Sequence, residues 1–155
     1  MEYLVRAARI TDIDRLVALS EPLALLERGD RLLGSADLLR QLVYLPQASV
    51  VVAEARRTVV GGAILALRPS VQVGGYIGTI DLLVADPAYD VERISEALID
   101  ELLRSARNKG CTIVDAARPD DPAALERWER MGFAPAGPRI ERIVAAGGVA
   151  ERTTR

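Results

Sequence analysis

The chain has 155 residues, of which half are hydrophobic, 27% are charged and only 4% are aromatic, a composition that suits one domain with a core of its own. It contains no histidine and one cysteine, Cys111, which together exclude Ser-His-Asp and Cys-His catalysis, histidine metal sites and an internal disulfide. Because the net charge is −2 and neither a signal peptide nor a membrane-length apolar run is present, we expect a cytoplasmic protein that binds neither nucleic acid nor membrane.

The N-terminal part of the sequence predicts a strand followed by two helices. Weak alternation over Tyr3–Ala7 indicates an edge strand. Thr11 and Asp14 have the spacing of a capping box, so a helix is expected to begin there, with Pro22 breaking it into two pieces. Ser35 is expected to cap a second, short helix. One apolar stripe of that helix is expected to be buried: Leu38, Leu39, Leu42 and Val43.

The periodicity then changes to that of strands. Ser49–Glu54 and Val59–Leu67 are rich in β-branched residues and flank the basic pair Arg56-Arg57, a pattern typical of an antiparallel hairpin. A third strand, Tyr76–Ala85, follows the Gly74-Gly75 turn.

The C-terminal part alternates helices and strands. A long amphipathic helix is predicted over Ile94–Asn108, a buried strand over Cys111–Ala116, a helix over Ala123–Met131 and a last strand over Ile140–Ala145. The order β-α-α-β-β-β-α-β-α-β indicates an α/β (α+β) fold with a mixed sheet.

Two local motifs and the spacing between them carry a resemblance to a known family. Val84-Ala85-Asp86-Pro87-Ala88-Tyr89 looks like a strand running into a coenzyme-binding loop, and Ala124-Leu125-Glu126-Arg127-Trp128-Glu129-Arg130-Met131-Gly132-Phe133 looks like a late helix with a Gly-Phe ending. With these motifs and this order of elements, the chain resembles the GCN5-related N-acetyltransferase (GNAT) superfamily. The resemblance covers most of the chain and implies a single domain over residues 1–147, with 148–155 as a frayed tail.

The resemblance implies a mostly antiparallel central sheet and a reaction. Members transfer an acetyl or short acyl group from coenzyme A to an amine, which can be a small molecule or a peptide. Acetyl-CoA or CoA would then be a cosubstrate, with no tightly bound cofactor and no metal. A homodimer is also implied at the level of the family.

The family's coenzyme loop follows the pattern Q/R-x-x-G-x-G/A, because glycines let backbone N–H groups approach the pyrophosphate at a helix N-terminus. Carried over without gaps, that pattern falls on residues 90–95, where Asp90, Arg93 and Ser95 replace its three defining residues. Asp90 and Glu92 repel a pyrophosphate, whereas Arg93 attracts one. Alternatively, the two acids cap the helix. The resemblance assigns the coenzyme to Val84, Ala85, Asp90, Val91, Glu92, Arg93, Ile94, Ser95 and Asp121.

The late helix departs from the family pattern at two positions. Trp128 stands where many members have a tyrosine that protonates the departing thiolate, and Asp121 stands where they have an asparagine. An indole N–H donates a hydrogen bond but is not a general acid. Trp128 is therefore expected to be a core or interface aromatic without a catalytic role.

A general base is needed to accept the proton of the attacking amine, and Asp81 is the main candidate. It lies in the predicted strand Tyr76–Ala85, at a position where members of the family often carry an acid. Burial would raise the pKa of its carboxyl. A solvated carboxylate or an ion pair with arginine is the alternative, and Glu54 is a second candidate.

Two functions are therefore carried forward from the sequence. One is a GNAT-like N-acyltransferase. The other is a catalytically impaired protein of the same fold that serves as a binding or dimerisation module, because fold alone does not fix function. The Gly61-Gly62 pair precedes no helix and is expected to mark a bulge, so it is not expected to form a phosphate loop.

Overall fold

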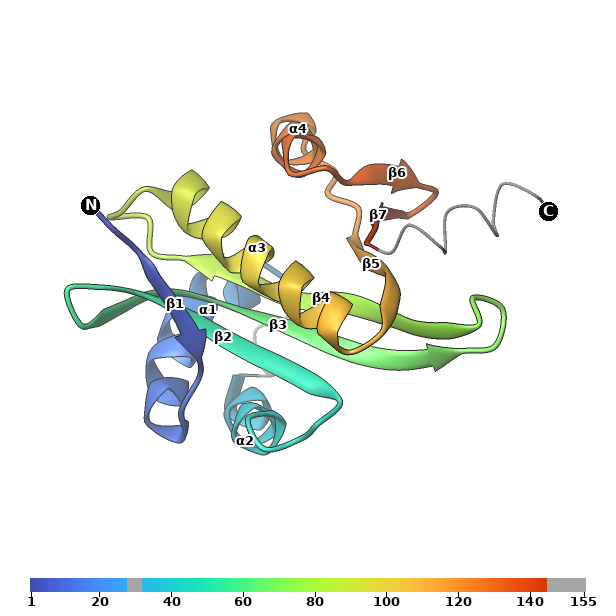
Figure 1. Ribbon diagram of the computed structural model, residues 1–155. Helices are drawn as coiled ribbons and strands as arrows, with labels where there is room; N and C mark the ends of the chain where they lie inside the picture. The colour runs from blue at the N-terminus through green and yellow to red at the C-terminus, as the bar shows by residue number, and fades with distance from the viewer. Residues whose placement is uncertain (28–31, 145–155) are drawn as a thin grey trace. The chain divides into compact units, whose positions relative to one another are not determined.

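The computed structural model describes the backbone of residues 1–27 and 32–144 and the side chains of residues 1–21 and 36–144 (Figure 1). The predicted tail, 148–155, lies outside the described residues. The elements, in chain order, are β1 (Leu4–Ala7), the 3-10 turn η1 (Ile10–Asp12), α1 (Ile13–Glu27), α2 (Leu32–Leu42), β2 (Ala48–Ala55), β3 (Thr58–Ser70), β4 (Gly75–Ala85), α3 (Val91–Asn108), β5 (Cys111–Ala117), α4 (Pro122–Arg130), β6 (Ala134–Ala136) and β7 (Arg139–Ile143).

The strands form a mixed sheet in the order β1-β2-β3-β4-β5-β7-β6. β4 and β5 pair in parallel, whereas β1 with β2, β5 with β7, and β6 with β7 pair antiparallel. This confirms the predicted α/β (α+β) class with a mostly antiparallel sheet and flanking helices. β6 was not predicted, because three residues that include Pro135 are too few to show alternation.

The chain divides into two compact units. The first comprises Met1–Ile64 and Leu82–Leu102, and the second comprises Leu65–Asp81 and Leu103–Arg155. Strands β3 and β4 each contribute residues to both units. The single domain over residues 1–147 stays a prediction.

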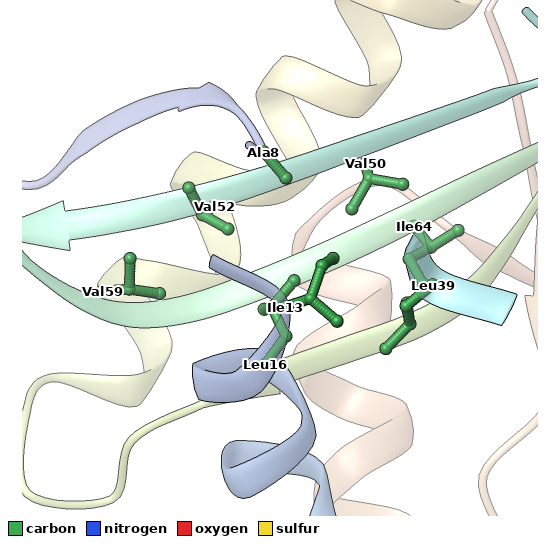
Figure 2. Close-up of a cluster of buried hydrophobic side chains, with 8 residues drawn as sticks. All are labelled: Ala8, Ile13, Leu16, Leu39, Val50, Val52, Val59 and Ile64. Carbon is green, nitrogen blue, oxygen red and sulfur yellow. The ribbon is translucent and has the colours of Figure 1, made fainter. Parts of the chain in front are cut away.

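The core of the first unit lies between its strands and the helices on either face. One cluster of buried side chains joins the segment between β1 and η1 to α1, α2, β2 and β3 (Figure 2). It consists of Ala8, Ile13, Leu16, Leu39, Val50, Val52, Val59 and Ile64. Leu42 and Val43 pack against it, as the predicted stripe requires, but Leu38 is exposed. The stripe is therefore narrower than the sequence suggested.

Gly61 and Gly62 let two helices approach opposite faces of β3 (Figure 1). A Cβ at Gly61 would lie 2.6 Å from Ile94 Cγ2 of α3 and 2.9 Å from the Val84 carbonyl oxygen. A Cβ at Gly62 would overlap Leu16 of α1. Close packing is therefore one reason for glycine at both positions. The predicted bulge stays a prediction.

The helix starts differ from the predicted ones. Thr11 lies inside η1, and the acid that accepts a backbone N–H there is Asp12, which bonds the Arg9 amide at 2.7 Å. The Thr11–Asp14 capping box was therefore wrong. Ser35 lies within α2 and does not cap it, and α1 continues through Pro22 without a break.

The two hairpin turns follow their sequences. Arg56 and Arg57 have φ values of 49° and 67°, the left-handed pair that a two-residue type I′ turn requires. Gly74, with a φ of 74°, closes the β3–β4 turn, where its N–H donates to the Ser70 carbonyl. Both predicted turns are confirmed.

The second unit has a core of its own around β5. Cys111, Val114 and Ala116 are buried, and burial raises the pKa of the Cys111 thiol. The Trp128 ring meets the buried Phe133 ring edge to face, with centroids 4.9 Å apart. Cys111 is thus the small core residue that a buried strand accommodates.

Candidate functional site

The connection from β4 to α3 is fixed by Asp86. Its N–H donates to the Val60 carbonyl at 2.7 Å, and its carboxylate accepts from the Ala88 amide at 2.9 Å and from Arg15 at 2.8 Å. Arg15 also donates from Nε to the Val59 carbonyl. The loop that leads to the start of α3 is therefore anchored to both α1 and β3.

The first turn of α3 is capped from within the protein. The Asp90 carboxylate accepts from the Arg93 amide at 3.2 Å, the geometry of a helix N-cap. The Asp90 amide itself donates to the Tyr3 hydroxyl at 3.2 Å. Of the two roles that the sequence left open for Asp90, the structure shows the helix cap.

Arg93 is the cation at this helix start. Its guanidinium lies 5.6 Å from the centroid of the Tyr3 ring, within the range of a cation–π contact. The side chain is otherwise exposed, as are those of Asp90 and Glu92. Tyr3 was not predicted to take part, because it lies 87 residues before Asp90 and no local pattern links the two.

The electrostatics of this helix start are divided. The helix dipole and Arg93 favour an anion, whereas Asp90 and Glu92 oppose one. The Asp90 carboxylate accepts the hydrogen bond of the Arg93 amide. Part of its negative charge is therefore compensated by the helix N-terminus and opposes a bound anion less. The residues present can therefore receive a phosphate through Arg93 and the helix dipole, without the glycine backbone of the family pattern.

The remaining predicted coenzyme residues of this segment divide into packed and accessible ones. Val84 and Ile94 are buried, and both approach Gly61. Ala85, Val91 and Ser95 are half-buried. Ala85, Val91 and Ser95 can therefore contact a ligand with their side chains. Val84 and Ile94 instead fix the end of β4 and the start of α3 by packing.

The two predicted base candidates differ in their surroundings. Asp81 is exposed on β4 and is not buried among its apolar neighbours. Glu54 accepts from Arg6 at 3.2 Å, and Arg6 also binds Asp12. Glu54 therefore belongs to a structural ion-pair network. Asp81 is a solvated carboxylate, one of the two alternatives predicted for it.

The two predicted positions on the late helix, Asp121 and Trp128, both contact neighbouring groups of the protein. Asp121 is the N-cap of α4 and accepts from the amides of Ala123 and Ala124 at 3.4 and 3.3 Å. Trp128 is half-buried against Phe133. Its expected role as a packing aromatic agrees with this contact.

One polar cluster was missed by the sequence analysis. Asp115 is buried in β5 and accepts from the Thr79 hydroxyl at 2.7 Å and from Arg139 at 2.9 Å. A lone acid within the apolar run Cys111–Ala116 was a usable signal, because charged residues are rarely buried unless paired. Its partners could not be read from the sequence, since they come from β4 and β7.

Neither a metal-binding cluster nor a membrane-spanning helix occurs among the described residues. Within residues 1–27 and 32–144, no group of three or more His, Cys, Asp or Glu side chains is placed to hold a metal ion. In the same part of the chain, no helix has the length and apolar character needed to cross a bilayer.

Comparison with known proteins gives a consistent set of relatives. The curated glucosamine 6-phosphate N-acetyltransferase of Trypanosoma brucei brucei is 35% identical over 78 residues, which cover 48% of this chain and 50% of that protein. The chain thus spans about half the length of this curated relative.

Solved structures extend the likeness over most of the fold. A Trypanosoma brucei acetyltransferase has a TM-score of 0.66 at 26% identity, covering 88% of this chain and 95% of that one. The PaiA N-acetyltransferase of Thermoplasma acidophilum, solved with coenzyme A, has a TM-score of 0.74 at 16% identity, covering 92% and 99%. The model of the acetyltransferase (GNAT) family matches residues 11–133. The chain therefore belongs to the GNAT family.

Proposed function

We propose that this protein is an N-acyltransferase that moves an acetyl or short acyl group from coenzyme A to a primary amine. The observation that carries the proposal is the family match over residues 11–133, which includes both β4 and the start of α3. In the reaction, a neutral amine attacks the thioester carbonyl, so that a C–N bond forms and the C–S bond breaks. The amine nitrogen loses a proton, and the coenzyme leaves as a thiol.

The pyrophosphate of the coenzyme is proposed to bind at the start of α3. Arg93 supplies the positive charge, and its contact with the Tyr3 ring limits the directions in which the guanidinium points. Asp90 contributes by ordering the first turn, since its carboxylate caps the Arg93 amide. Val91 and Ser95 offer accessible surface on the same turns of the helix.

The proton steps are proposed to use solvent. Asp81 is an exposed carboxylate on β4, suited to accept the amine proton through water. Trp128 has no acidic proton to give, and the departing thiolate is proposed to take its proton from water. Glucosamine 6-phosphate, the amine named for the curated relative, belongs in the first set of acceptors to be assayed.

The test measures thiol release from acetyl-CoA with a set of amine acceptors. Arg93→Gln is expected to raise the KM for acetyl-CoA about tenfold, because charge-assisted contacts to phosphate are strong. Arg107→Gln, which removes an exposed arginine at the other end of α3, is the matched control and is expected to leave that KM unchanged. Absence of both thiol release and acetyl-CoA binding would refute the proposed function.

The sequence also predicted a homodimer, a cytoplasmic location and, as an alternative function, a catalytically impaired module. The family match favours a transferase over that module. The homodimer and the location stay predictions. Size-exclusion chromatography with light scattering tests the oligomeric state.

A further inference from the structure

The polar cluster around Asp115 leaves hydrogen-bonding groups unused. Asp115 Oδ1 accepts from both Thr79 Oγ1 and Arg139 Nη2. Its second oxygen, Oδ2, receives no hydrogen bond from any residue that the structure describes. A carboxylate has about four acceptor positions, so this oxygen can accept from a donor outside the protein.

Arg139 is also only partly engaged. Its Nη2 binds Asp115, whereas its Nε is buried and has no partner among the described residues. The side chain is 40% exposed, so the rest of the guanidinium reaches solvent. An anion that reaches this exposed part of the guanidinium gains a charge-assisted contact.

The cluster lies where two parallel strands stop pairing. The register of β4 with β5 runs from Tyr76 opposite Cys111 to Thr79 opposite Asp115, although β4 continues to Ala85. Asp115 also lies opposite Glu141 of β7. Because side chains alternate along a strand, Asp81, two residues after Thr79, lies on the same face as the cluster.

We infer that this cluster binds the acceptor, and that the acceptor is an amine that also carries an anionic group, a carboxylate or a phosphate. The acceptor ammonium donates to Asp115 Oδ2, and its anionic group binds the uncommitted edge of Arg139. This inference rests on the proposed function and adds the chemical class of the acceptor. Both contacts come from the second unit, through β5 and β7.

The experiment compares acceptors that differ only in the anionic group. Thiol release from acetyl-CoA is measured with glucosamine 6-phosphate against glucosamine, and with glycine against glycinamide. The two pairs separate phosphate from carboxylate as the recognised group. At least one anionic member is expected to have a kcat/KM about tenfold above that of its neutral partner, the size of effect that a charge-assisted contact produces.

Variants assign the preference to Arg139. Arg139→Gln is expected to raise the KM for the preferred anionic acceptor about tenfold and to change that of the neutral partner less than about twofold. Arg139→Lys is expected to keep part of the preference, because a lysine retains the charge but lacks the planar fork. Arg118→Gln removes an exposed arginine just after β5 and is the control for loss of charge, with the preference unchanged.

A structural role for Arg139 would give a different result. In that case Arg139→Gln would lower the melting temperature and change the KM equally for both members of each acceptor pair. That outcome overturns the inference. Equal use of neutral and anionic amines by the unmodified protein also overturns it, while leaving the proposed function standing. If no amine is acetylated, calorimetric titration with glucosamine 6-phosphate and glycine decides, because binding lost in Arg139→Gln supports the inference and no binding overturns it.

Discussion

Asp12→Asn is the substitution whose effect on stability the structure defines best. Asp12 is buried in η1, and its carboxylate accepts three hydrogen bonds. Arg6 donates two of them, from Nη1 at 2.7 Å and Nη2 at 3.1 Å, and the Arg9 amide donates the third at 2.7 Å. An asparagine removes the charge and turns one acceptor into a donor that faces other donors.

The size of the loss follows from what remains after the substitution. Breaking a buried ion pair by changing one partner costs about 3–5 kcal/mol. Arg6 keeps Glu54 as a partner at 3.2 Å, and its side chain is 20% exposed. The expected loss is therefore about 3 kcal/mol in the free energy of unfolding, at the lower end of that range.

The assay is urea unfolding followed by far-ultraviolet circular dichroism. Asp37→Asn is the control, because Asp37 pairs with Arg40 at 2.9 Å but is 78% exposed, and its loss is expected to stay below about 0.5 kcal/mol. A loss below about 1 kcal/mol for Asp12→Asn would show that the Asp12–Arg6 pair contributes little to the free energy of unfolding.

The pH dependence gives an independent check on the same pair. The hydrogen bond from Arg6 holds the pKa of the Asp12 carboxyl below its ordinary value of 3.8, with burial opposing the shift and the Arg9 amide assisting it. A lowered folded-state pKa contributes stability above the unfolded value, and that contribution is lost as pH falls through the folded value. The gap between wild type and Asp12→Asn is therefore expected to be constant near neutral pH and to narrow below about pH 4. A gap that does not narrow in acid contradicts this assignment.

Three further predictions concern single positions. Gly61→Ala is expected to destabilise by about 1–3 kcal/mol, because its Cβ would meet Ile94 and the Val84 carbonyl; an unchanged urea midpoint would show that α3 can shift at no cost. Arg57→Gly is expected to stabilise by roughly 0.5–1 kcal/mol, since φ is 67° there, and a lower melting temperature would contradict the left-handed turn. Asp90→Asn keeps a capping oxygen but removes a charge, so acetyl-CoA is expected to bind several-fold more tightly in calorimetry, with stability nearly unchanged. Weaker binding would mean that the Asp90 charge helps.

The sequence predicted most of the fold because local patterns agree with tertiary structure in most segments. The β2–β3 hairpin and the long helix α3 have strong periodicity and clear turn residues. The predicted N-terminal cap was wrong because Asp12 binds Arg6 of β1 and the Arg9 amide, partners that the Thr11–Asp14 pattern does not contain. Leu38 was predicted to be buried but is exposed, because packing against β2 decides which side of α2 is buried.

The candidate site was predictable only where its residues are neighbours in the chain. The helix-capping role of Asp90 followed from its place before an amphipathic helix. The contact of Tyr3 with Arg93 could not be predicted in this way, because the two residues lie far apart in the sequence. The Asp115 cluster needed the strand register, which places residues of β4, β5 and β7 side by side.

Calorimetric titration of the unmodified protein with acetyl-CoA, with Arg93→Gln in parallel, tests directly whether the coenzyme binds at the start of α3. Saturable binding at one site is expected, accompanied by a rise in melting temperature, and Arg93→Gln is expected to bind more weakly. Absence of both heat and thermal stabilisation at millimolar acetyl-CoA would contradict the claim that the start of α3 binds the coenzyme.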